Sequence, residues 1–129
     1  MLKFFILLSM IFLHIIDDYY LQGILAQMKQ REWWRKHEEY KDLYKYDYIM
    51  ALLEHAFSNT FMMMLPIMVY IIYTNNTSKI TVFIIYFIIN ILGHATTDNI
   101  KCNIKSINLI RDQLIHIAYI ILTWLAILV

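Results

Sequence analysis

The stretch that decides the fold is residues 80–98, which read ITVFIIYFIINILGHATTD. A long apolar run comes first, and His94 and Asp98 follow it, four positions apart. The run is continuous rather than alternating, which is typical of a membrane helix and not of a barrel strand. A charged side chain inside a bilayer costs roughly 2.5–3.5 kcal/mol on insertion scales, so such residues are rarely idle. This stretch therefore predicts a membrane helix that carries a polar site towards one end.

Composition supports the same class for the rest of the chain. Of its 129 residues, 60% are hydrophobic and only 16% are charged, whereas a soluble domain has about 45–50% apolar residues. We expect an all-α membrane protein with one domain, residues 1–129. The net charge of +1 points to no nucleic-acid partner. The single cysteine, Cys102, excludes an intrachain disulfide.

Three more apolar runs flank this stretch, so we expect a four-helix transmembrane bundle. The predicted helices are 2–28, 48–73, 80–100 and 107–129. The first resembles a signal peptide, but no small-x-small cleavage site follows it, so we interpret it as a retained membrane helix. The loop 29–47 holds Trp33, Trp34 and several tyrosines, which prefer the bilayer interface. We expect the loop to lie along the membrane surface, with a solvated linker as the alternative and His37 in solvent.

The basic residues predict the orientation of these helices. Nine lysines and arginines lie in or beside the connections after the first and third helices, and two, Lys3 and Lys79, lie on the other side. The positive-inside rule then places both termini outside the cytoplasm. We therefore expect a multi-pass protein of the inner, cytoplasmic membrane.

Four polar clusters interrupt the apolar runs. At a rise of about 1.5 Å per residue, all four fall at one depth, in the cytoplasmic half of the bundle. If each cluster were placed independently at one end of its helix or the other, all four would fall on the same side of the bundle about one time in eight. The clusters are His14-Asp17-Asp18, Glu54-His55, His94-Asp98 and Asp112-Gln113-His116.

The spacing within the clusters suggests a metal site. Three His/Asp pairs stand at i and i+4, so both members of each pair share a helix face. Imidazole and carboxylate suit zinc, with manganese or iron as alternatives. A divalent ion would also offset the burial of four aspartates, which would otherwise cost on the order of 10–14 kcal/mol. The proposed metal ligands are His14, Asp18, His94, Asp98, Asp112 and His116.

Neighbouring polar residues are candidates for the remaining roles. A hydrolytic metal site leaves one position open for water. The catalytic candidates are Asp17, Glu54 and His55, of which His55 could instead be a further ligand. The candidates for orienting the ligands are Gln22 and Gln113. The candidates for holding a phosphate are Lys29 and Arg111, unless these cations are ordinary positive-inside flanks.

The order and spacing of these motifs resemble a family of small bacterial and phage membrane proteins that carry a domain of unknown function. The resemblance covers nearly the whole chain. The matching motifs are His14-Ile15-Ile16-Asp17-Asp18-Tyr19-Tyr20-Leu21-Gln22, Lys29, His55, His94-Ala95-Thr96-Thr97-Asp98 and Asp112-Gln113-Leu114-Ile115-His116. The doubled Asp17-Asp18 departs from the family pattern and leaves open which aspartate binds a metal.

The pattern is also similar to integral-membrane proteins described as metal-dependent hydrolases. That resemblance implies a metal-dependent hydrolase. We expect a lipid or a lipid-linked substrate in the bilayer, and either a single chain or a homo-oligomer. One rival interpretation is a membrane structural or interaction protein, natural in a phage context, whose clusters form a metal-free polar network. Another is a small metal or proton transporter, although Gly23, Gly93 and Pro66 offer few sites for broken helices.

Overall fold

All regular structure in the described part of the chain is helical. The computed structural model describes residues 1–36 and 42–129. Four of its helical segments are long and apolar enough to cross a membrane, which confirms the all-α class and the four apolar helices expected from the sequence. These segments are Leu2–Leu21, Asp47–Tyr73, Thr77–Ile104 and Leu109–Leu128.

The first segment is shorter than the expected helix 2–28. Helix α1 (Leu2–Ile16) continues as one π-helical turn, η1 (Asp17–Leu21), and the chain then breaks before the short helix α2 (Leu25–Met28). Gly23 occupies the break with a φ of +52°, a left-handed conformation that glycine adopts without steric cost. Because π-helical turns are frequent at functional sites, the position of η1 at the doubled aspartates directs attention to this end of the molecule.

The expected surface loop begins with a short helix, α3 (Arg31–Arg35), that is tied to the end of the bundle. The backbone N–H of Arg31 donates to Oδ1 of Asn103 at 2.8 Å. Glu32 pairs with Lys105 at 2.8 Å, and this hydrogen bond lowers the pKa of the Glu32 carboxyl. Residues 37–41 lie outside the described residues, so the expectation that His37 faces solvent lies outside them too.

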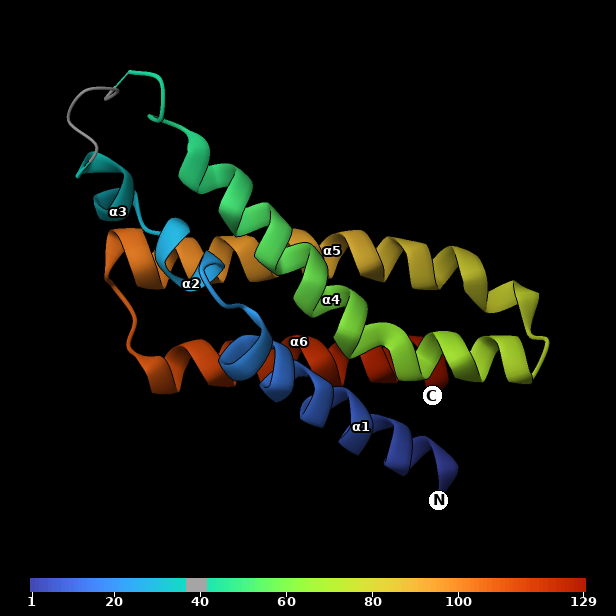
Figure 1. Cartoon of the computed structure of the whole chain (residues 1–129). Coiled ribbons are helices and arrows are strands. Elements are labelled where there is room, and N and C mark those ends of the chain that lie inside the picture. Colours follow the sequence, from blue (N-terminus) through green and yellow to red (C-terminus); the bar gives the residue numbers. More distant parts are fainter. Residues whose placement is uncertain (37–41) are drawn as a thin grey trace.

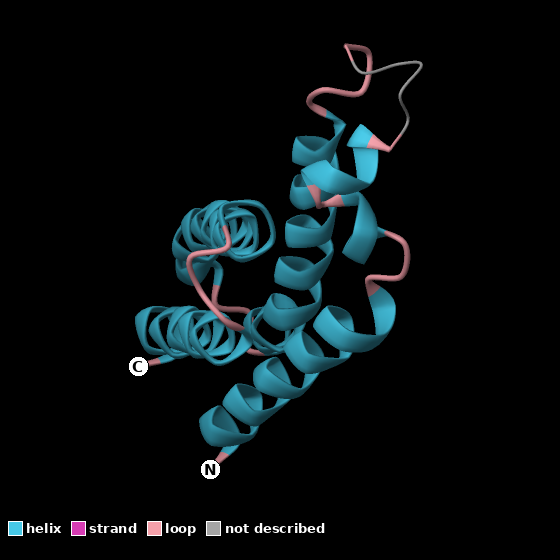
Figure 2. Ribbon diagram, turned by 90° about the vertical axis from the view of Figure 1, so that its left-hand side faces the viewer, coloured by secondary structure: helices cyan, strands magenta, loops and turns pink. Residues whose placement is uncertain are grey.

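The remaining elements complete the bundle. They are α4 (Asp47–Tyr73), the 3-10 turn η3 (Thr77–Lys79), α5 (Ile80–Asn99), the π-helical turn η4 (Ile100–Ile104) and α6 (Leu109–Leu128). Helices α5 and α6 run antiparallel side by side, and α1 and α4 cross them obliquely (Figures 1 and 2). Both termini and the α4–α5 turn lie at one end, and α3 lies at the other (Figure 1).

The interior is divided into an apolar part and a polar part. The apolar part lies towards the termini and is built from α1, α4 and α6, with Met10, Met64 and Ile67 fully buried. At Gly93, a Cβ atom would meet the Tyr119 ring at 2.8 Å. The absence of a side chain there lets α5 and α6 approach closely, immediately beside His94.

The outward surface is apolar even where the interior is polar. Leu92 is 58% exposed and Leu114 is 63% exposed, yet each lies two residues from a buried histidine, His94 or His116. Soluble proteins show the reverse arrangement, with charged groups outside. At this level α5 and α6 therefore keep their histidines inside and large apolar side chains outside.

Candidate metal centre

The structure brings residues from all four polar clusters into one buried group, which we call the polar core. Side chains four positions apart share a helix face, so α1–η1, α5 and α6 each turn a His/Asp pair inward. Helix α4 adds a histidine between them. All members are at most 5% exposed. They are His14, Asp17 and Asp18 from α1–η1, His55 from α4, His94 and Asp98 from α5, and Asp112 and His116 from α6.

A first set of four possible metal ligands lies at the centre of the polar core. It consists of Asp18, His55, His94 and Asp98, whose nearest ligand atoms all lie within 4.8 Å of one another. Nε2 of His55 lies 3.1 Å from Nε2 of His94, 3.2 Å from Oδ1 of Asp18 and 3.5 Å from Oδ2 of Asp98. His94 Nε2 lies 3.8 Å from the same Asp98 oxygen. The first set thus combines one residue from η1, one from α4 and two from α5, and all four face a common centre.

These spacings suit a metal ion with tetrahedral coordination. Zinc–ligand bonds of about 2.0–2.1 Å in tetrahedral geometry separate the ligand atoms by about 3.3–3.4 Å. Four of the six spacings between the ligand atoms, from 3.1 to 3.8 Å, bracket that value, and all six are within 4.8 Å. Two nitrogens and two carboxylate oxygens also form a donor set that zinc accepts. The first set therefore fits a divalent ion in both geometry and chemistry.

A second set shares Asp98 with the first. It consists of Asp98, Asp112 and His116, and Nε2 of His116 lies 3.5 Å from an oxygen of each aspartate. Oδ1 of Asp112 and Nε2 of His116 are buried and have no hydrogen-bond partner among the described residues. Buried polar atoms are nearly always satisfied, so these two atoms are suited to an ion or a water between them.

Two lysines partly neutralise the polar core. Lys29 Nζ donates to Oδ2 of Asp98 at 2.6 Å, and Lys101 Nζ donates to Oδ2 of Asp112 at 2.6 Å. Neither Asp17 nor Asp18 is paired with a lysine or arginine among the described residues. The four aspartates of the core outnumber these two lysines by two, an excess that one divalent cation or protonated histidines would balance.

Asp17 lies behind His55, on the side away from the first ligand set. Its Oδ1 accepts a hydrogen bond from the Ser58 hydroxyl at 2.6 Å. Its Oδ2 lies 3.8 Å from Nδ1 of His55, and both of these atoms lack a hydrogen-bond partner among the described residues. Carboxylates in this position orient a metal-binding histidine and set its tautomer. Of the two adjacent aspartates, the structure thus places Asp18 among the possible ligands and Asp17 behind one of them.

Gln113 links the helices of the polar core, as an orienting residue would. Its Nε2 donates to Oδ2 of Asp18 at 2.8 Å and to Oδ2 of Asp112 at 3.1 Å. His14, expected as a ligand, lies outside both ligand sets. Its Nδ1 lies 3.0 Å from Oδ1 of Asn59, and its Nε2 lies 3.4 Å from Oε1 of Gln113. His14 therefore joins α1 to α4 and α6 through amide groups.

Three other expected site residues lie apart from the ligand atoms. Glu54 is exposed on α4, because the residue next to His55 points away from the core. Arg111 is exposed at the start of α6. Gln22 donates to the backbone carbonyl of Asp18 instead of its carboxylate. Lys29, considered for phosphate binding, is instead buried against Asp98.

Three polar residues of the core were not identified from the sequence. Ser58 and Asn59 follow His55 by three and four positions, so helical spacing could have placed them on the same face. Lys101 follows Asp98 by three positions, so helical spacing could also have placed Lys101 on the face that carries Asp98. They were missed because an isolated serine, asparagine or lysine carries no metal-ligand signature.

A small cavity borders the polar core on the side of three histidines. A cavity of about 10 Å³ lies beside His14, His94 and His116. A water molecule needs about 10–15 Å³ measured in this way. This cavity can hold at most one water molecule and is far too small for a lipid headgroup.

Comparisons with protein-family models, with curated proteins and with solved structures found no match to this chain.

Proposed function

We propose that the protein is a membrane-embedded, metal-dependent hydrolase acting on a lipid or lipid-linked substrate. The observation that carries the proposal is the pair of ligand sets that share Asp98. The first set offers four ligands, as in closed structural sites, whereas the second offers three. A three-ligand set leaves a position for water, which is the arrangement of hydrolytic metal sites.

The membrane location is supported by where the polar and apolar side chains lie. Four helices have the length and composition to cross a bilayer. Their outward faces carry large apolar residues at the level of the buried histidines and aspartates, as Leu92 and Leu114 illustrate. Figure 1 also groups α3 and the α5–α6 connection at one end, away from the termini. We propose that this lysine- and arginine-rich end faces the cytoplasm.

The residues of the polar core have distinct parts in this proposal. A bound divalent ion would supply Lewis acidity and lower the pKa of a bound water to about 7. Lys29 and Lys101 hold Asp98 and Asp112 in position through their ion pairs. Asp17, whose Oδ2 lies 3.8 Å from Nδ1 of His55, would orient this histidine once the two atoms close to hydrogen-bond distance. Since the cavity beside His14, His94 and His116 holds only about 10 Å³, a lipid would reach these histidines only after the helices separate locally.

The tight packing of the core favours one alternative function. Both lysine–aspartate pairs are complete without a metal, and Gln113 bridges two aspartates. A network of this kind can hold helices together in lipid, where polar contacts between helices contribute about 0.6–2 kcal/mol each. The protein would then be a membrane scaffold or interaction protein without catalytic activity.

Metal content separates these two functions. We expect detergent-purified protein to retain zinc, manganese or iron at one or two ions per chain, measured by mass spectrometry of the elements. Asp98→Asn should remove most of this metal because both ligand sets use Asp98. Asp42→Asn, a matched change at an exposed position, should leave it unchanged. Fewer than about 0.2 ions per chain in the unchanged protein, even after reloading, would contradict the metal site and favour the scaffold.

Activity is tested on protein whose metal content is known. We expect phosphate or acyl release from a panel of membrane lipids to depend on metal and to be lost in Asp112→Asn, which removes a ligand of the three-member set. Metal-loaded protein without any such release, but with vesicle uptake of the same ion, would contradict the hydrolase and indicate a transporter.

A further inference from the structure

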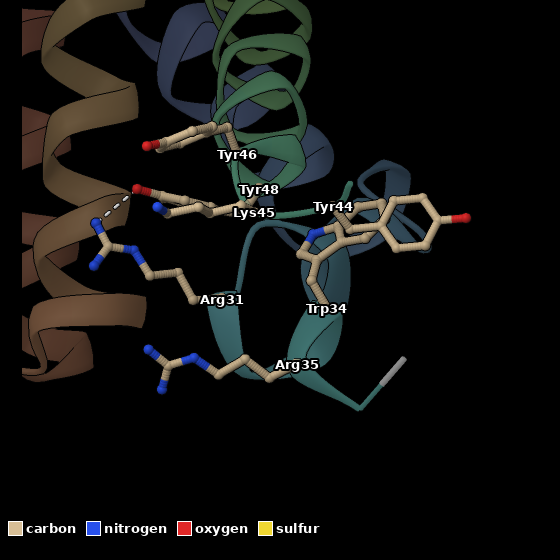
Figure 3. A pocket seen from close by; sticks show the side chains of 7 residues that line it. All are labelled: Arg31, Trp34, Arg35, Tyr44, Lys45, Tyr46 and Tyr48. Atoms are coloured by element: carbon tan, nitrogen blue, oxygen red, sulfur yellow. Dashed lines mark hydrogen bonds between the residues drawn. The ribbon is translucent and has the colours of Figure 1, made fainter. Parts of the chain in front are cut away.

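A second site lies outside the polar core. A pocket of about 590 Å³ opens between α3 and the segment that leads into α4. Figure 3 shows the side chains that surround it. They are Arg31, Trp34, Arg35, Tyr44, Lys45, Tyr46 and Tyr48, and we call this site the cationic pocket. Its volume falls within the range of about 300–1,000 Å³ typical of small-molecule sites.

The cationic pocket presents three positive charges. Arg31, Arg35 and Lys45 are exposed, and no acidic side chain is present among its described lining residues. In Figure 3 the side chains of Arg31 and Arg35 extend to the same side from neighbouring positions on α3. The ion pairs formed between described residues involve none of the three cations. Their exposed side chains can therefore reach an anionic ligand in the pocket.

Arg31 is held in position before any ligand binds. Its Nη2 donates to the Tyr48 hydroxyl at 2.6 Å, and its guanidinium lies 4.6 Å from the centre of the Tyr48 ring. Tyr48 is only 8% exposed, so it is a rigid support. A guanidinium fixed in this way retains other N–H groups for a ligand, and its planar fork matches the oxygens of a phosphate.

The surroundings of the pocket resemble a membrane–water boundary. Tyr46 and Tyr48 flank the first residue of α4, Asp47, where the apolar helix begins. Tryptophan and tyrosine concentrate at the headgroup level of bilayers, and Trp34 and Tyr44 lie together at the far side of the pocket (Figure 3). A phosphate at this level belongs most naturally to a lipid headgroup.

We propose that the cationic pocket binds the headgroup phosphate of an anionic membrane phospholipid. The three cations bind the negatively charged phosphate, and the aromatic rings pack against the glycerol portion of the headgroup. Anionic lipids are attracted to basic residues just outside a membrane helix, at a gain of about fivefold in affinity per cation. The site is independent of the metal centre and of any hydrolysis there.

Lipid retention by the full-length protein tests this proposal. Protein purified in detergent with a chelator present would receive equal amounts of phosphatidylglycerol and phosphatidylcholine, and native mass spectrometry would count the bound lipids. We expect phosphatidylglycerol to exceed phosphatidylcholine about tenfold or more. Arg35→Gln should lower its retention about fivefold. Lys36→Gln, directly after α3 and not lining the pocket, is the matched control and should retain the lipid as the unchanged protein does.

A second variant and a soluble competitor complete the test. Tyr48→Phe removes the hydroxyl that holds Arg31, keeps the ring, and should weaken retention of phosphatidylglycerol while the melting temperature stays unchanged. Equal retention of both lipids, or an equal loss in Lys36→Gln, would overturn the proposal. Displacement of the lipid by millimolar glycerol 3-phosphate would overturn the lipid assignment and identify a soluble phosphate as the ligand.

Discussion

Replacing Lys29 with methionine should reveal whether Asp98 also binds a metal. The two side chains are 7% and 2% exposed and meet at 2.6 Å, so solvent screens their interaction little. Removing one member of a buried ion pair costs about 3–5 kcal/mol, because the other charge stays buried and unpaired. In a chelator, Lys29→Met should therefore lower the melting temperature by roughly 10–20 °C for a chain of this length.

The size of this loss should depend on metal. Without Lys29, Asp98 and its neighbours are more negative and attract a divalent cation more strongly. An ion at about 100 times its dissociation constant stabilises the folded protein by about 2.7 kcal/mol. Added zinc should therefore narrow the difference in melting temperature between Lys29→Met and the unchanged protein. Differential scanning fluorimetry in detergent, with and without zinc, measures both values.

A double variant distinguishes the effect of an unpaired charge at Asp98 from the effect of altered side-chain packing. Lys29→Met combined with Asp98→Leu removes both charges and should recover most of the stability measured in chelator, since replacing a whole buried pair by apolar groups is often neutral. A shift below about 2 °C for Lys29→Met in chelator would refute the importance of the ion pair. A difference that zinc leaves unchanged would refute metal binding at Asp98.

The remaining predictions concern three other positions. Asp17→Asn should weaken zinc binding about 10–100-fold while retaining the fold, because Asp17 orients His55 from behind; an unchanged affinity by competition with a chromogenic chelator would contradict that role. Gly23→Ala should destabilise the protein by about 1–2 kcal/mol because of its left-handed backbone, and chemical unfolding in detergent measures the cost. Cys102, half-buried in η4, should react with thiol reagents from the cytoplasmic side; labelling only from outside would reverse the proposed orientation.

Much of this fold can be predicted from the order of residues along the chain. An apolar run long enough to cross a bilayer has few alternatives to a helix, because its backbone must form all its hydrogen bonds within the segment. The pairing of His94 with Asp98 and of Asp112 with His116 is equally local, because an α-helix brings positions i and i+4 to one face. Helical class, the four long helices and the inward-facing pairs were therefore predictable.

The break at Gly23 was harder to predict. An uninterrupted helix to residue 28 was expected because the residues around Gly23 are apolar, and a single glycine is tolerated within a helix. The structure instead uses the glycine to turn the chain after η1. Lys29 is thereby placed against Asp98, from which it is separated by most of the chain.

The sequence by itself determined which helices form and which face of each is polar, since both depend on neighbours within one or two turns. Tertiary structure alone decided that Asp98 belongs to both ligand sets and that Lys29 pairs with Asp98 and Lys101 with Asp112. It also decided that Asp18 rather than Asp17 faces the ligand centre. Adjacent residues on a helix point about 100° apart, so a small rotation of α1–η1 would exchange the two aspartates. That rotation is set by packing against α4 and α6, through contacts between residues distant in sequence.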